Sequence, residues 1–263
     1  MSNADAVIAA LRSGYDSLAS RVSEFGDDDL ARPSGAAEWD VAQVLSHLGS
    51  GAEISRATVQ AALDGEPNPG ADFNHAVWDK WNAMTRREQA SGFLSANQVL
   101  LGLLESLDAS TRDTLRVDMS FLPAPVDVAT VARLRLNEFT LHSWDIRVVS
   151  DPDATLPADA TAELLHGEPN LIGWIGKADP LNGREAAVAV STTEPASVFA
   201  LRLRAPISVD FDIPDEPDGT LTLPAEAWLR LVAGRLAPRH TPASVAAAGA
   251  ADLGLLRQVF PGY

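Results

Sequence analysis

The apolar residues follow two different periods along the chain, and this change of period constrains the fold more than any other feature of the sequence. Over roughly the first 150 residues they recur at steps of three and four, as on one face of an amphipathic α-helix. After residue 185, short runs of alternating or β-branched residues are typical of strands. These runs cover residues 186–191, 198–204, 207–213 and 220–223. The sequence therefore predicts an α+β fold in which the helices come first.

Four helical segments are expected in the N-terminal part. They cover residues 7–25, 41–63, 73–108 and 127–149. Asp40 is a suitable N-cap for the second segment, which ends at Gly65 and Pro67. An interruption of the third segment is expected at Ser91 and Gly92. Helices of this length, joined by connections of varied length, predict a four-helix bundle.

The rest of the chain is expected to form a connecting segment and a small α+β domain. The predicted domains are residues 1–150, 151–185 and 186–263. In the connecting segment, residues 161–175 are a candidate helix. In the last domain, Asp218 and Gly219 are typical of a hairpin turn. Further helices are expected at 225–236 and in the Ala- and Leu-rich tail 243–260.

The charge of the chain restricts its partners. There are 20 Lys and Arg residues against 36 Asp and Glu residues, which gives a formal net charge of −16. Such a chain repels nucleic acids and anionic membrane surfaces, so neither is an expected partner. The sequence shows no signal peptide and no apolar run of membrane-spanning length. We expect a soluble cytoplasmic protein that is a monomer or a small homo-oligomer.

The chain contains no cysteine. Disulfide bonds, cysteine-ligated metal sites and a cysteine nucleophile are therefore excluded. Any thiol chemistry would need a thiol that another molecule supplies.

Three residues in the helical part have the chemistry of a metal site. Glu138 and His142 are four residues apart, so they share one face of a helix. A histidine from a facing helix could complete the set, and His47 lies in the middle of another predicted helix. Two imidazoles and one carboxylate leave a coordination position open, as in catalytic zinc sites, although other divalent metals accept the same ligands.

Several of these residues also have a simpler interpretation. A single histidine in a helix is more often a packed or surface residue than a ligand. Asp145 could orient His142 by a hydrogen bond to the ring nitrogen that does not bind the metal, or it could pair with Arg147 or water. Trp78 and Trp81 are expected in the core, with stacking on a sugar or an aromatic substrate as the alternative.

Three segments, taken in order, resemble the mycothiol-dependent maleylpyruvate isomerase family of the DinB-like superfamily. Residues 39–48, WDVAQVLSHL, resemble its first signature. Residues 134–145, LRLNEFTLHSWD, resemble its second signature, a glutamate and a histidine four residues apart followed by aspartate. Residues 231–235, LVAGR, resemble the Ala-Gly-Arg motif of its C-terminal domain. The order and spacing fit across nearly the whole chain.

The resemblance implies both a fold and a site. The N-terminal part would be a DinB-like four-helix bundle that holds zinc through His47, Glu138 and His142, and the C-terminal part a sterol-carrier-like α+β domain. The cofactor thiol would be mycothiol. Coordination to a dication favours the thiolate, which could add to an electrophilic carbon of a small substrate. The motif arginine, Arg235, would face the active site and hold a carboxylate or a developing enolate. The alternative is a surface arginine that stabilises the end of a helix.

One segment departs from the family pattern. Where the isomerases tend to carry arginine, this chain has Phe73, which favours a less charged substrate than maleylpyruvate. His75 lies close by in the sequence and could line the pocket or relay a proton; an exposed position is the alternative.

The resulting hypothesis is a mycothiol-dependent isomerase or S-transferase that acts on a small electrophile. The two reactions use the same thiolate and differ in where the adduct goes. A non-enzymatic small-molecule or lipid-binding protein that uses the C-terminal domain is an alternative. Metal-assisted hydrolysis with Asp145 as the general base is another.

Overall fold

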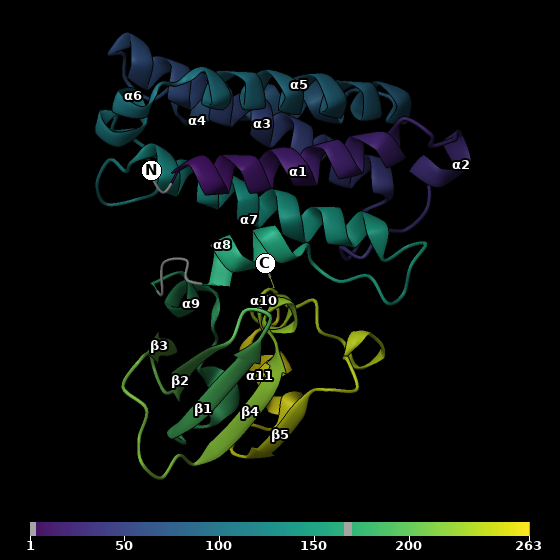
Figure 1. Cartoon of the computed structure of the whole chain (residues 1–263). Coiled ribbons are helices and arrows are strands. Elements are labelled where there is room, and N and C mark those ends of the chain that lie inside the picture. Colours follow the sequence, from purple (N-terminus) through teal and green to yellow (C-terminus); the bar gives the residue numbers. More distant parts are fainter. Residues whose placement is uncertain (1–3, 166–169, 263) are drawn as a thin grey trace. The chain divides into compact units, whose positions relative to one another are not determined.

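The computed structural model describes residues 4–165 and 170–262. The chain divides into two compact units, Met1–Ala154 and Thr155–Tyr263. The first is helical and the second combines helices with a sheet, which confirms the predicted α+β class (Figure 1). The domain limits at 150 and 186 stay a prediction.

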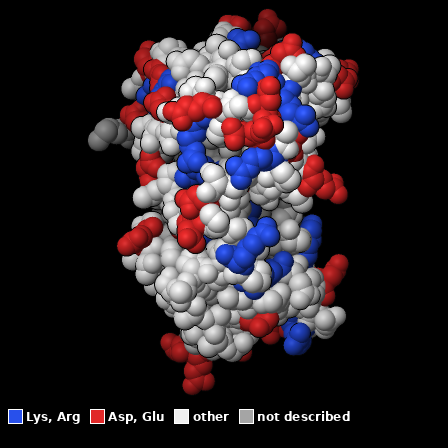
Figure 2. All heavy atoms as spheres, turned by 90° about the vertical axis from the view of Figure 1, so that its right-hand side faces the viewer, with Lys and Arg blue, Asp and Glu red and all other residues white. Residues whose placement is uncertain are grey.

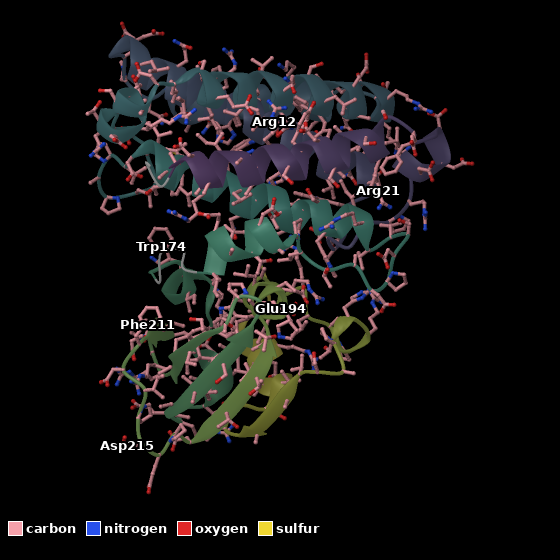
Figure 3. All side chains as sticks on the ribbon, in the orientation of Figure 1. Arg12, Arg21, Trp174, Glu194, Phe211 and Asp215 are labelled. Carbon is pink, nitrogen blue, oxygen red and sulfur yellow. The ribbon has the colours of Figure 1, made fainter. Side chains whose placement is uncertain are left out.

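Four long helices of the first unit form a bundle (Figure 1). In the described part of the chain, α3 packs against α5 and α7, and α1 packs against α7 and α5, which closes the bundle. An ion pair on its surface joins Arg12 of α1 to Glu105 of α5 at 2.8 Å (Figure 3 labels Arg12). The helices of this unit are α1 (Ala4–Val22), α2 (Asp27–Leu30), α3 (Val41–Asp64), α4 (Gly70–Asn82), α5 (Arg86–Ser106), α6 (Ala109–Thr114) and α7 (Val128–Arg147).

Local signals and packing agree in most of these helices. The side chain of Asp40 caps α3 by accepting a hydrogen bond from the backbone nitrogen of Gln43, and Asp127 caps α7 through Thr130 in the same way. The predicted stripe of α1 is buried in the bundle. Its buried residues are Val7, Ile8, Leu11, Tyr15, Leu18 and Val22, whereas the last predicted residue, Phe25, lies beyond the end of α1 and is half-buried.

The expected interruption at Ser91 and Gly92 is wrong, because the break lies between α4 and α5 instead. The side chain of Thr85 caps α5 by accepting a hydrogen bond from the backbone nitrogen of Glu88, and the carboxylate of Glu88 accepts one from the backbone nitrogen of Thr85, so α5 starts before the predicted interruption. Gly92 lies within α5. A glycine is needed there because an added Cβ would lie only 2.9 Å from the ring of Trp81.

The two tryptophans of α4 have different environments. Trp81 is buried among the helices, as expected, and its indole nitrogen donates a hydrogen bond to Glu53 of α3 at 2.9 Å. Trp78 is exposed, so the expected core position is wrong for this residue, which lies on the outer face of α4.

The second unit is built on a mixed sheet with the strand order β3-β2-β1-β4-β5 among the described residues. Strand β1 is antiparallel to β2 and parallel to β4. The strands are β1 (Ala186–Thr193), β2 (Ser197–Leu203), β3 (Ser208–Asp210), β4 (Gly219–Pro224) and β5 (Ala246–Gly249). The helices are α8 (Ala158–Leu165), α9 (Asn170–Ile175), α10 (Ala225–Val232) and α11 (Leu253–Val259), with short 3-10 turns at Asp179–Leu181 and Pro238–His240.

Two expectations for this unit are wrong. Asp218 and Gly219 do not form a hairpin turn, because β4 pairs with β1 and β5 and not with the preceding strand β3. Gly219 is needed for close approach instead, since an added Cβ would lie 2.7 Å from the carbonyl oxygen of Ala248. The tail 243–260 is not one helix, because its alanines at 246–249 complete the edge of the sheet as β5 and only its end forms α11.

The candidate helix at 161–175 falls partly on α8 and partly on α9, and residues 166–169 lie outside the described residues.

The surface of the protein carries exposed aromatic side chains, among them Trp174 on α9 and Phe211 just after β3 (Figure 3). On the face shown in Figure 2, acidic and basic side chains are interspersed, so the acidic excess does not form a single patch there. Within the described residues, no helix is both long and apolar enough to cross a bilayer.

Candidate metal centre

Two neighbouring helices bring three candidate ligands to one point. Glu138 and His142 lie one turn apart on α7, and His47 faces them from α3. The Nε2 atoms of His47 and His142 lie 3.1 Å and 3.7 Å from the same carboxylate oxygen, Oε2 of Glu138. One ligating atom from each residue lies within 4.8 Å of the other two. A single ion between them could bind all three.

The cluster is closed on one side and open on the other. The side chain of His142 is only 8% exposed, whereas those of His47 and Glu138 are 36% and 35% exposed. A ligand or substrate can therefore approach from the side of His47 and Glu138.

Asp145 fixes the ring of His142. It is fully buried, and its Oδ2 lies 2.9 Å from Nδ1 of His142. Because an ionised carboxylate can only accept a hydrogen bond, neutral His142 carries its proton on Nδ1. The lone pair of Nε2 then faces Glu138, as metal binding requires. This position suits the orienting role expected from the sequence and not that of a general base, since Asp145 is buried behind the histidine.

The carboxylate of Glu138 is held in its charged form. Burial raises its pKa, but a hydrogen bond with His47 and the positive charges nearby outweigh burial and hold the pKa below its usual value. One of these charges is Arg135, a buried guanidinium whose own pKa burial lowers to about 10. Arg135 is thus charged at neutral pH, and it donates hydrogen bonds to the carbonyl of Leu48 and to Oδ1 of Asn97. It ties α7 to α3 and α5 beside the cluster.

The chemistry of this donor set fits a divalent cation. Two imidazole nitrogens and one carboxylate oxygen are the protein ligands of many catalytic zinc sites, which keep a fourth position for water or substrate. Other divalent metals accept the same donors. The exposed side of the cluster leaves room for that fourth ligand.

The remaining predicted residues lie on other elements than the three candidate ligands. Phe73 is half-buried and His75 exposed on α4, where the ring of His75 contacts Trp78 at 5.2 Å between centroids. Arg235 belongs to the second unit, directly after Gly234, whose positive φ of 72° ends α10. Arg235 is buried and not at the surface, and its Nη1 donates to the carbonyl of Ala233 at the end of α10, which is the helix-end contact that the alternative expected.

Sequence reasoning missed the importance of Trp39. Its ring centroid lies 5.2 Å from that of His47 and 5.9 Å from that of His142, so one indole packs on both histidines. Arg135 was missed in the same way. Trp39 and Arg135 lie in two of the three segments that carry the family resemblance, and this location was the only signal that pointed to them.

The fold and the site define an α+β protein whose helical bundle carries a candidate centre for a divalent metal. A family model described as the mycothiol maleylpyruvate isomerase N-terminal domain matches residues 11–147. The chain therefore belongs to this family. No curated protein matches the chain.

Solved structures show the same fold over nearly the whole chain. A crystal structure of the mycothiol-dependent maleylpyruvate isomerase is similar with a TM-score of 0.62 at 14% identity, covering 92% of this chain and 91% of that chain. A histidine-to-alanine mutant of a mycothiol-dependent maleylpyruvate isomerase is similar with a TM-score of 0.59 at 13% identity, covering 87% and 88%. At these identities the likeness shows the fold, and it extends through both units.

Proposed function

We propose that the chain is a metal-dependent enzyme that uses the thiol of mycothiol to isomerise a small electrophilic substrate. The observation that carries the proposal is the convergence of His47, Glu138 and His142 on one point, with Asp145 behind them and an open side in front. Membership of the family and the likeness to a mycothiol-dependent isomerase support the choice of thiol. S-transfer to a substrate of the same class is the alternative reaction.

The proposed ligands are His47, Glu138 and His142, and zinc is the proposed metal. A bound divalent cation would favour the thiolate form of the thiol, which is the nucleophile. Because the chain has no cysteine, that thiol must come with the cofactor. The role of Asp145 is to hold the ring of His142, and the role of Arg135 is to keep a positive charge near Glu138.

Three further residues have proposed roles in binding substrate. Arg235 would hold a carboxylate or a developing enolate, because its guanidinium is a fixed fork of donors. Phe73 would favour an apolar electrophile, because it stands where the isomerase pattern tends to have arginine. His75 would line the substrate pocket or relay a proton. An Arg235→Ala variant that kept full activity would remove that residue from the proposal.

A carrier function of the second unit has less support. It requires an apolar cavity, and a pocket beside the start of β1 and the end of β2 has a volume of 280 Å³. It is lined by Leu181, Leu203 and Leu255 together with Arg184 and two carboxylates. Ligand-binding cavities usually measure about 300–1,000 Å³ and enclose most of their ligand, so this pocket does not favour a lipid.

The test of the proposal is turnover by the zinc-loaded full chain. Mycothiol is supplied with small cis-configured electrophiles, some with one carboxylate and some with two, and the products are followed by NMR. We expect a trans product with mycothiol regenerated, no turnover without mycothiol, and loss of turnover in His47→Ala. His240→Ala, a histidine outside the cluster, is the matched control and should retain activity.

Each outcome of this test decides between the candidates. Accumulation of a stable S-conjugate would replace isomerisation by S-transfer. Hydrolysis of ester or amide substrates without mycothiol would favour a metal-bound hydroxide as the nucleophile. No thiol-dependent reaction in protein that binds zinc would contradict the proposal.

A further inference from the structure

The segment that leads into α3 is a small loop closed by its own hydrogen bonds. We refer to residues 32–40 as the 32–40 loop. The backbone nitrogen and the Oγ of Ser34 both donate to the carbonyl of Trp39, at 2.9 Å and 2.8 Å. Pro33 and Asp40 form an isolated antiparallel bridge, and the nitrogen of Val41 donates to the carbonyl of Arg32. These contacts within the loop define its backbone conformation without help from other elements.

The 32–40 loop is fastened to the end of α7. The nitrogen of Gly35 donates to the carbonyl of Asp145 at 2.7 Å, one of the last-turn carbonyls that lack a helical partner. Glycine is required here by space, because an added Cβ would lie 3.0 Å from Cα of Asp145, 3.1 Å from its Oδ1 and 2.9 Å from Val148. Arg32 adds a second link by donating to the carbonyl of Val149 at 2.7 Å. The loop thus fixes the backbone of the residue that orients His142.

The other end of the loop covers the two histidines. Trp39 packs on His142 with an angle of 29° between the rings and on His47 with an angle of 45°. The preceding residue, Glu38, has a φ of 67°, which a residue with a side chain adopts only where its surroundings hold it. Trp39 itself is 36% exposed, so its ring contacts the two histidines on one face while part of it remains in contact with solvent.

We propose that the 32–40 loop is a positioning element for the divalent cation, because it holds the two histidines of the cluster in the orientation that binds the metal. Gly35 fixes Asp145, Asp145 fixes His142, and Trp39 limits the rotation of both imidazole rings. The loop also joins the start of α3 to the end of α7, and these two helices carry the three ligands. The inference rests on the proposed function, because it assumes that the cluster binds a metal.

The experiment measures the zinc dissociation constant of the full chain by competition with a chromophoric chelator, together with the visible spectrum of the cobalt form. In Gly35→Ala we expect affinity to fall at least about tenfold, as when a residue that orients a ligand is lost, and the cobalt spectrum to change. In Ser34→Ala, which touches no ligand, we expect a smaller loss of about three- to fivefold from one missing hydrogen bond. Trp39→Phe should lie between the wild type and Trp39→Ala, because a smaller ring still packs on the histidines.

Gly102→Ala is the matched control. Gly102 lies in α5 with no atom within 4 Å of an added Cβ, so the same substitution should leave both zinc affinity and the cobalt spectrum unchanged. If Gly35→Ala does not fold, Ser34→Ala and Trp39→Phe decide the question.

The outcomes separate the inference from the proposed function. If the wild type binds no zinc or cobalt, the proposed function fails and the inference fails with it. If the wild type binds metal and the loop variants bind it within about twofold, with the wild-type cobalt spectrum, the inference is overturned while the proposed function stands. Loss of thermal stability with unchanged metal affinity would also overturn it, because the loop would then serve only to close the bundle.

Discussion

Both units bury charged side chains, but they arrange these charges differently. On α10 of the second unit, Glu226 and Arg230 form two hydrogen bonds at 2.7 Å and 2.8 Å, and Arg230 also donates to the carbonyl of His240. In the first unit, His47 and His142 point their nitrogens at one oxygen of Glu138 on a partly exposed side. The first arrangement pairs donors with acceptors inside the protein, and the second directs acceptors toward a common point. A buried pair of this kind stabilises the fold, whereas a converging cluster with an open side is suited to bind an ion.

The largest effect is expected from breaking the closed pair. Glu226→Ala would leave the guanidinium of Arg230 buried without its carboxylate, which typically costs about 3–5 kcal/mol of unfolding free energy. Urea unfolding, with hydrogen exchange of β1 and β4 to localise the loss to the second unit, measures it. Glu216→Ala, at an exposed position, is the control and should change the unfolding free energy by less than about 0.5 kcal/mol. A loss below about 1 kcal/mol in Glu226→Ala would show that the pair does not stabilise this unit.

The next effect concerns the residue behind the open cluster. Asp145→Asn keeps the volume of the side chain but weakens its hold on Nδ1 of His142, so we expect zinc affinity to fall about 10- to 100-fold. Chelator competition measures this change, and Asp113→Asn, on an exposed face of α6, is the matched control. Unchanged zinc affinity in Asp145→Asn would contradict the orienting role.

The smallest effect is expected at the ion pair between Glu53 and Lys80, which is less buried than the pair on α10. Burial raises the pKa of Glu53, but hydrogen bonds from Lys80 and Trp81 outweigh burial and leave it below its usual value. Because the pKa of the folded state is lowered, the stability it contributes is present above the usual glutamate pKa and is lost as the pH falls through the lowered value. Glu53→Gln should therefore cost about 1 kcal/mol near neutral pH.

Urea unfolding across the acid range checks the sign of this effect. The wild type and Glu53→Gln should converge in unfolding free energy as the pH falls below the lowered pKa of Glu53. A difference that persisted at acid pH would show that the contribution comes from packing rather than from the charge.

The sequence predicts those elements whose signals are local. Asp40 and Asp127 cap the helices that follow them, and the stripe of α1 is buried as its spacing requires. The strand β5 could not be found in this way, because alanine favours a helix and only pairing with β4 makes residues 246–249 extended. The parallel partner of β4 is β1, which is also far from it in the chain. The local turn signal of Asp218 and Gly219 was therefore misleading.

The candidate site shows the same division. The pairing of Glu138 with His142 follows from their spacing on one helix, and Asp145 follows from its position three residues later. The third ligand, His47, comes from another helix, so it was assigned through the family resemblance and not through spacing. The contact of Gly35 with Asp145 and the packing of Trp39 on His142 join segments about a hundred residues apart in the chain and could be found only in the structure.

The metal content of the purified protein tests most directly whether the His47, Glu138 and His142 cluster binds a divalent cation. The full chain is purified without chelator, and its zinc is counted by mass spectrometry beside His47→Ala, His142→Ala and the control His240→Ala. We expect about one zinc per chain in the wild type and the control, and loss of zinc in both cluster variants. Folded wild-type protein that holds no metal, even after incubation with zinc, would contradict it.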